Sequence, residues 1–164
     1  QSYPEHIIVA DMKTCDAGQH EAIQAFEAGA DITTVMAFSA DKTITDTLEV
    51  AKRYNKKIMV DLLNVHEKRR IEELRELGVE LVSLHYGKDM QQVGEFHTDL
   101  FSLVKDFAEL EVAVAGGINL DSLPSILSEN LNTIIVGSAI TKASDCGEVA
   151  RTMKGMIKEY EINH

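Results

Sequence analysis

The stretch IIVADMKTCDAG, residues Ile7–Gly18, joins an apolar run to three charged side chains, Asp11, Lys13 and Asp16. A short apolar run rich in β-branched residues is typical of a strand that is buried on both faces. Charged side chains are unfavourable inside such a strand, so we expect these three at its end. The stretch therefore predicts a buried strand that delivers charges to its carboxyl end.

Five further segments have the same short, apolar, β-branched character, and amphipathic stretches with helical spacing separate them. This alternation predicts a parallel sheet with right-handed crossovers, that is, an α/β protein. We expect one domain over residues 1–164, with about six strand–helix units. The predicted strands are residues 6–11, 31–36, 57–63, 80–85, 111–117 and 132–138. The predicted helices are residues 19–29, 43–55, 66–78, 98–110, 120–130 and 147–161.

The composition excludes several classes of partner. The formal net charge is −11 at pH 7, so we expect no binding to nucleic acid or to anionic membranes. No apolar run reaches the roughly 18 residues that a transmembrane helix needs. Two cysteines, Cys15 and Cys146, are too few for a disulfide framework. We therefore expect a reduced, cytoplasmic protein.

Polar residues or glycines follow each other at the carboxyl ends of the predicted strands. In parallel α/β proteins ligands bind at this end of the strands, in open sheets and in barrels alike. We therefore expect these residues to form one site. They are Asp11, Lys13, Asp61, His85, Gly116, Gly117, Gly137 and Ser138.

The charges after the first strand fit two interpretations. Side chains alternate along a strand, so Asp11 and Lys13 would point the same way, with Asp16 in the following turn. Two carboxylates beside one lysine leave surplus negative charge that suits Mg²⁺, and the ammonium could stabilise an oxyanion. Alternatively, the lysine is simply neutralised by two surface acids.

The histidine and the glycines are equally open to two interpretations. His85 is either an acid–base group in register with Asp11 and Asp61 or a structural histidine. The segments VAGGI, residues 114–118, and IVGSAIT, residues 135–141, bind phosphate through backbone N–H groups or form tight turns. The polar stretch of residues 85–99 is a lid over the site or an ordinary surface loop.

The motif DMKTCDAG matches the D-x-K-x-x-D motif of the orotidine 5′-phosphate decarboxylase superfamily. Within that superfamily the chain resembles the 3-hexulose-6-phosphate synthases. The shared motifs are DMKTCDAG, VDLLNV, HYGKDMQQ, VAVAGGI and IVGSAIT, in family order across nearly the whole chain. The resemblance implies a (β/α)₈ TIM barrel of the ribulose-phosphate-binding type.

The resemblance also implies an activity, that of an aldehyde-lyase. Such an aldolase condenses D-ribulose 5-phosphate reversibly with formaldehyde to give 3-hexulose 6-phosphate, through an enediolate stabilised by Mg²⁺. The family implies a homodimer with shared active sites. The partners would thus be a small sugar phosphate, formaldehyde and a second copy of the chain.

Residue roles follow from the same resemblance. Asp11 would be a metal ligand, and Lys13 would stabilise the enediolate. Asp61 would hold Lys13 in place, His85 would handle protons, and Asp16 would reach across the dimer interface into the partner's site. The substrate phosphate would lie against Gly116, Gly117, Gly137 and Ser138.

Two departures from the family pattern leave alternatives open. Lys88 stands where the sister 3-keto-L-gulonate-6-phosphate decarboxylases place an arginine, although DLLN at Asp61 favours the synthases. The family barrel has eight units and this chain has six, so we expect the first two to be missing from it. The alternatives are a decarboxylase of the sister type and a non-catalytic sugar-phosphate-binding fragment.

Overall fold

The computed structural model describes residues 4–87, 98–129 and 131–163. Its strands form one parallel sheet in which each strand pairs with the next along the chain. The predictions of a parallel α/β fold and of six adjacent strands are therefore confirmed. The strands are β1 (Val9–Thr14), β2 (Ile32–Met36), β3 (Lys57–Asp61), β4 (Leu81–His85), β5 (Glu111–Ala115) and β6 (Thr133–Ile135).

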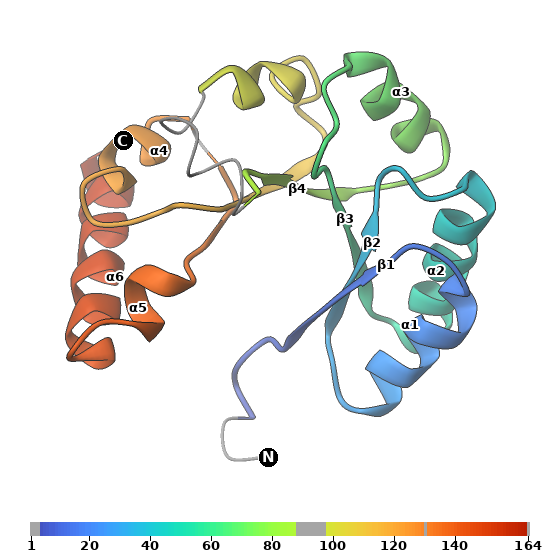
Figure 1. Cartoon of the computed structure of the whole chain (residues 1–164), viewed down its shortest axis with the longest axis horizontal. Helices are drawn as coiled ribbons and strands as arrows, with labels where there is room; N and C mark the ends of the chain where they lie inside the picture. The colour runs from blue at the N-terminus through green and yellow to red at the C-terminus, as the bar shows by residue number, and fades with distance from the viewer. Residues whose placement is uncertain (1–3, 88–97, 130, 164) are drawn as a thin grey trace.

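The sheet curls into an arc, and the helices lie along its outer side (Figure 1). This is the arrangement of a TIM barrel left open between β1 and β6, the two edge strands. The helices are α1 (Gly18–Glu27), α2 (Asp41–Tyr54), α3 (Lys68–Glu76), α4 (Leu123–Leu127), α5 (Ser138–Thr141) and α6 (Cys146–Asn163), with a 3₁₀ helix, η2 (Thr98–Leu103), between β4 and β5. Within the described ranges, no helix combines the length and apolarity that crossing a membrane requires.

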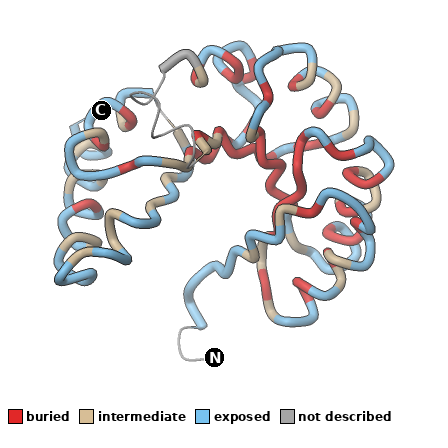
Figure 2. The backbone as a smooth tube through the Cα atoms, viewed as in Figure 1, coloured by how far each residue is buried: buried red, intermediate tan, exposed pale blue. Residues whose placement is uncertain are grey.

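The hydrophobic core lies between the sheet and the helices. Figure 2 shows buried residues concentrated in the middle of the sheet and on the helix faces turned toward it. Val35, Val60 and Val82 of β2, β3 and β4 are fully buried, as is Ile44 of α2. The edges differ: the side of the arc near β1 is exposed, with Ile7 at 72%. Apolar exposure of this kind follows directly from the open edge.

The predicted fourth helix, residues 98–110, is wrong. The structure has a 3₁₀ helix over Thr98–Leu103, and the chain continues in three-residue turns. Val104, Phe107 and Leu110 each donate a backbone N–H to the carbonyl three residues earlier. The buried apolar side chains recur every third residue, beginning at Phe101. That period matches the three residues per turn of a 3₁₀ helix better than the 3.6 of an α-helix.

The predicted fifth helix is too long, and a short helix was missed. Residues 120–130 were expected to be helical, whereas α4 covers only Leu123–Leu127. The Asn119 side chain accepts from the backbone of Asp121 and Ser122, which holds the preceding residues in a turn. The one-turn helix α5 starts directly after Gly137, where only a glycine loop was predicted.

Gly116 follows β5 in a position that requires the absence of a side chain. Its φ is 103°, in the left-handed region that favours glycine. A Cβ at this position would lie 2.1 Å from the carbonyl oxygen of Tyr86. The backbones after β4 and β5 therefore approach each other closely because residue 116 is a glycine.

Replacing Gly116 tests that close approach. Gly78 is a matched control, because its φ is 90° but a Cβ there would meet nothing within 4 Å. Both Gly→Ala changes introduce backbone strain, and Gly116→Ala adds steric overlap that costs about 1–3 kcal/mol more. We expect urea denaturation to show the larger loss of unfolding free energy for Gly116→Ala. Equal losses for the two variants would contradict the packing described here.

Candidate functional site

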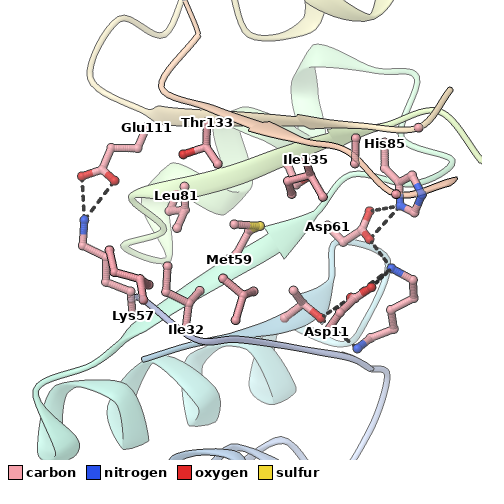
Figure 3. A pocket seen from close by; sticks show the side chains of 18 of the residues that line it. Asp11, Ile32, Lys57, Met59, Asp61, Leu81, His85, Glu111, Thr133 and Ile135 are labelled. Carbon is pink, nitrogen blue, oxygen red and sulfur yellow. Dashed lines mark hydrogen bonds and ion pairs between the residues drawn. The ribbon is translucent and has the colours of Figure 1, made fainter. Parts of the chain in front are cut away.

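The concave face of the sheet encloses an open cavity of about 1030 Å³, lined by side chains from all of the strands. Figure 3 shows two charged ends to this cavity, with apolar side chains such as Met59 and Leu81 between them. One end holds most of the residues that the sequence predicted for the site. They are Asp11, Lys13, Asp61, His85, Gly116, Gly117, Gly137 and Ser138.

Lys13 is the centre of this end of the cavity. Its Nζ lies 3.0 and 2.9 Å from the two carboxylate oxygens of Asp11 and 3.0 Å from Oδ2 of Asp61. Asp11 comes from the same strand, whereas Asp61 ends β3, two strands away. The ammonium is therefore fixed from two sides, with its side chain 39% exposed to the cavity. An ammonium held in this way is suited to stabilising negative charge that develops nearby.

Asp61 links Lys13 to His85. The Nδ1 atom of His85 lies 2.9 Å from Oδ2 of Asp61, and the backbone N–H of Leu63 donates to Oδ1 at 2.9 Å. The Asp61 side chain is only 5% exposed, so these partners replace the water that it loses. A carboxylate that orients an imidazole through Nδ1 leaves Nε2 to exchange protons.

Opposing effects set the pKa values in this cluster. Burial alone would raise the pKa of Asp61, but hydrogen bonds and charge from His85 and Lys13 outweigh burial and hold that pKa below its ordinary 3.8. Burial would likewise lower the pKa of Lys13. Hydrogen bonds to Asp11 and Asp61 outweigh it, so this pKa lies above its ordinary 10.5. Around neutral pH the cluster therefore contains an ammonium and a buried carboxylate.

Lys13 reaches its position through an irregular backbone. Simple strand alternation was expected to point Asp11 and Lys13 the same way. Both do line the cavity, but the β1–β2 register shifts between Ala10 and Thr14. Lys13 has a φ of 49°, a left-handed conformation that is uncommon for a residue with a side chain. A bulge, rather than regular pleating, therefore directs the lysine into the cavity.

Asp16 does not join the cluster within one chain. It is exposed in the turn after β1, and its Oδ1 accepts the N–H of Ala17 at 2.7 Å. It lines a separate surface hollow near the start of α1. The interpretation that Asp11 and Asp16 flank Lys13 is thus corrected: the second carboxylate is Asp61, from a strand 48 residues further along the chain.

Two cavity residues were not predicted from the sequence. Thr34 of β2 lines the cavity and bonds to both Asp11 and Lys13. Its only sequence signal is a threonine in an apolar strand, which is common in any sheet. Lys142, directly after α5, also lines the cavity. A lone lysine near a helix resembles an ordinary surface residue, so no sequence signal distinguishes it.

The opposite end of the cavity carries its own charges. Lys57 at the start of β3 pairs with both carboxylate oxygens of Glu111, at 2.7 and 2.9 Å. Lys56 pairs with Asp31 on the same side. These lysines are neutralised by carboxylates and lie at the amino ends of the strands, away from His85 and the glycines (Figure 3). We therefore place the candidate site at the carboxyl ends.

The predicted lid falls mostly on residues 88–97, including Lys88, which lie outside the described residues. In the described ranges, no group of three or more His, Cys, Asp and Glu side chains could hold a metal ion. Asp11 is the half-exposed carboxylate of the site, with 58% of its side chain accessible. Its oxygens are of the type that Mg²⁺ prefers, and Mg²⁺ is often bound by one or two carboxylates together with water and substrate.

The fold and site define an α/β barrel-type protein with a lysine–carboxylate site at the carboxyl ends of its strands. Residues 1–153 match the model of the orotidine 5′-phosphate decarboxylase / HUMPS family. The chain belongs to this family.

Individual relatives are similar over most of their length. The 3-hexulose-6-phosphate synthase of Bacillus subtilis is 39% identical over 159 residues, which are 96% of this chain and 76% of that protein. The crystal structure of 3-hexulose-6-phosphate synthase from Salmonella typhimurium superposes with a TM-score of 0.93 at 32% identity, covering 97% of this chain and 76% of that one. KGPDC (3-keto-L-gulonate-6-phosphate decarboxylase) from Streptococcus mutans, in complex with a D-pentose phosphate, gives 0.88 at 26% identity, over 97% and 76%.

The pH dependence of stability tests the environment of Asp61. Because the folded-state pKa lies below the unfolded value, the carboxylate contributes stability above about pH 4, and this is lost as pH falls through the folded pKa. We expect Asp61→Asn to be less stable than wild type at pH 7 and the difference to shrink toward pH 3. Urea denaturation across this range measures it.

Asp121→Asn is the matched control, since Asp121 is an exposed carboxylate outside the cavity. Its stability should follow that of wild type within about 0.5 kcal/mol at every pH. A constant gap between wild type and Asp61→Asn from pH 7 to pH 3 would contradict the ion-pair environment.

Proposed function

We propose that the protein catalyses the reversible aldol condensation of D-ribulose 5-phosphate with formaldehyde to 3-hexulose 6-phosphate. The main support is Lys13, held at the carboxyl ends of the strands by Asp11 and Asp61. The second support is the resemblance to relatives named 3-hexulose-6-phosphate synthase. An ammonium fixed beside an acid–base histidine is suited to enediolate chemistry.

The proposed chemistry begins with loss of a proton from C1 of ribulose 5-phosphate, next to the C2 carbonyl. His85 accepts this proton at Nε2 while Asp61 keeps Nδ1 oriented. The electron pair forms an enediolate whose oxyanion Lys13 stabilises. C1 then attacks the carbon of formaldehyde, a C–C bond forms, and the former formaldehyde oxygen takes up a proton. The reverse reaction breaks the same bond.

The glycine residues at the same end are the proposed phosphate site. Gly116 and Gly117, with φ values of 103° and 69°, and Gly137 and Ser138 all line the cavity. Backbone N–H groups in such loops bind phosphate without bulky side chains in the way. We add Lys142, which lines the same cavity and supplies a local positive charge to an acidic protein.

A divalent cation, Mg²⁺, is part of the proposal, with Asp11 as its ligand from this chain. Because no larger group of ligating side chains exists in the described ranges, water and substrate oxygens would fill the remaining positions. When bound, the ion would act as a Lewis acid toward the carbonyl and enediolate oxygens.

Lys13→Ala tests the catalytic role directly. The lysine acts on charge that appears during the reaction, so its loss lowers turnover more than binding. We expect ribulose 5-phosphate-dependent formaldehyde consumption to fall about 10²–10³-fold, the scale for removing one oxyanion stabiliser. Binding of ribulose 5-phosphate, measured by calorimetry, should persist.

Lys57→Ala is the matched control, because Lys57 lines the same cavity and pairs with a carboxylate at its opposite end. Its turnover should remain close to wild type. A chelator and Asp11→Ala should each abolish the activity if the cation is required. Near-normal turnover of Lys13→Ala, or an equal loss in Lys57→Ala, would refute the assigned role.

A decarboxylase activity is the second candidate, favoured by the superposition on the KGPDC structure that holds a pentose phosphate. Both reactions pass through an enediolate, so the same lysine would serve either one. Release of CO₂ from 3-keto-L-gulonate 6-phosphate distinguishes them. The aldolase proposal requires formaldehyde consumption to be the faster reaction.

We also propose a homodimer in which Asp16 completes the partner's site. The support is the family, together with the exposure of Asp16 and its separation from Lys13 within one chain. In a symmetric dimer, an exposed carboxylate that lies outside its own site is free to act across the interface.

Subunit mixing tests this arrangement. Lys13→Ala and Asp16→Ala should each be inactive alone, whereas mixed dimers contain one site with both groups intact. We expect the mixture to recover activity that neither variant has, with dimers seen by sedimentation velocity. If the mixture stays inactive while Asp16→Ala alone is inactive, Asp16 acts within its own chain.

A further inference from the structure

We propose that Thr34 is a positioning residue for the reaction: its hydroxyl ties the backbone of Lys13 to the carboxylate of Asp11. The inference rests on the proposed function, in which Lys13 acts on the substrate. Thr34 is not assigned contact with substrate. It acts through the two residues that the hydroxyl connects.

The bulge in β1 creates the need for such a residue. Ala10 pairs with Thr33 and Thr14 pairs with Val35, so the β1 residues between them stand opposite Thr34 alone. Within this interruption Lys13 has its left-handed φ of 49°. A backbone N–H at a bulge has lost its regular partner in the ladder and requires another acceptor.

The Thr34 hydroxyl meets this requirement. Lys13 donates its backbone N–H to Oγ1 at 2.9 Å, and the hydroxyl donates to Oδ1 of Asp11, also at 2.9 Å. A hydroxyl has one proton to donate and lone pairs to accept, so a single oxygen serves both partners. Thr34 is only 4% exposed, and water therefore competes little for these bonds.

The contacts close a ring. The backbone of Lys13 binds Thr34, Thr34 binds Asp11, and Asp11 binds the Nζ of Lys13 through both carboxylate oxygens. The side chain and the main chain of Lys13 are thus held through one buried hydroxyl. Threonine suits this role because branching at Cβ restricts its χ1 angle. Removal of the hydroxyl frees the left-handed backbone and the carboxylate together.

Thr33 provides an internal comparison. It is the neighbouring residue of β2, is similarly buried, and donates its hydroxyl to the carbonyl oxygen of Ala10 at 3.1 Å. It does not line the cavity, whereas Thr34 does. Both threonines therefore join β1 to β2, and of the two it is Thr34 that connects to Asp11 and Lys13.

The experiment compares Thr34→Val, Thr34→Ser and Thr33→Val. Valine keeps the shape and removes the hydroxyl, and serine restores the hydroxyl. A small displacement of a catalytic group costs up to about 10²-fold, so we expect Thr34→Val to lower kcat by about 10–100-fold. Thr34→Ser should recover most of the loss, and Thr33→Val should keep wild-type kcat. Where Thr34→Val does not fold, Thr34→Ala replaces it.

A second measurement does not depend on the reaction. Hydrogen exchange of the Lys13 amide, followed by NMR, should accelerate in Thr34→Val and return toward wild type in Thr34→Ser. If wild type lacks aldolase activity, the proposed function fails while accelerated exchange still supports the positioning role. Unchanged Lys13 exchange in Thr34→Val, or equal kcat losses in Thr34→Val and Thr33→Val, would overturn the inference.

Discussion

The contact of the Lys13 ammonium with two carboxylates is the interaction around which the site is built. Asp11 precedes the lysine by two residues, whereas Asp61 comes from β3 and is almost fully buried. A sheet in which β1, β2 and β3 are adjacent and parallel brings these groups together. The same Asp61 orients His85 from β4. One buried carboxylate thereby joins the charge-stabilising group to the proton-transfer group.

Local strain and close packing support this contact from both sides. In β1 a bulge places Lys13 in a left-handed conformation, which costs about 1–2 kcal/mol for a residue with a side chain. After β5, Gly116 allows the backbone to pass close to Tyr86. Strained positions of this kind persist where the surrounding structure determines them, and they are frequent at functional sites. Here the surrounding structure is the buried sheet, whose central strands contribute much of the core.

The sequence predicted the sheet well because strands buried on both faces are apolar along their whole length. It also placed Asp61, His85 and the glycines at one end of the cavity, since strand ends in a parallel sheet share an edge. It assigned Asp16, instead of Asp61, as the second acid beside Lys13, because spacing along the chain does not reveal contacts between distant strands. Thr34 was missed for the same reason. The helix predicted over residues 98–110 failed because apolar spacing of three was taken for helical spacing.

A crystal structure with ribulose 5-phosphate bound tests the central claim most directly, since the cavity has lysines at both ends. The account predicts the phosphate against Gly116, Gly117, Gly137 and Ser138, with the substrate C2 oxygen within hydrogen-bond distance of Lys13 Nζ. It also predicts that Lys57 keeps its pairing with Glu111. A sugar phosphate bound at the Lys56–Lys57 end, with Lys13 still facing only Asp11 and Asp61, would contradict it.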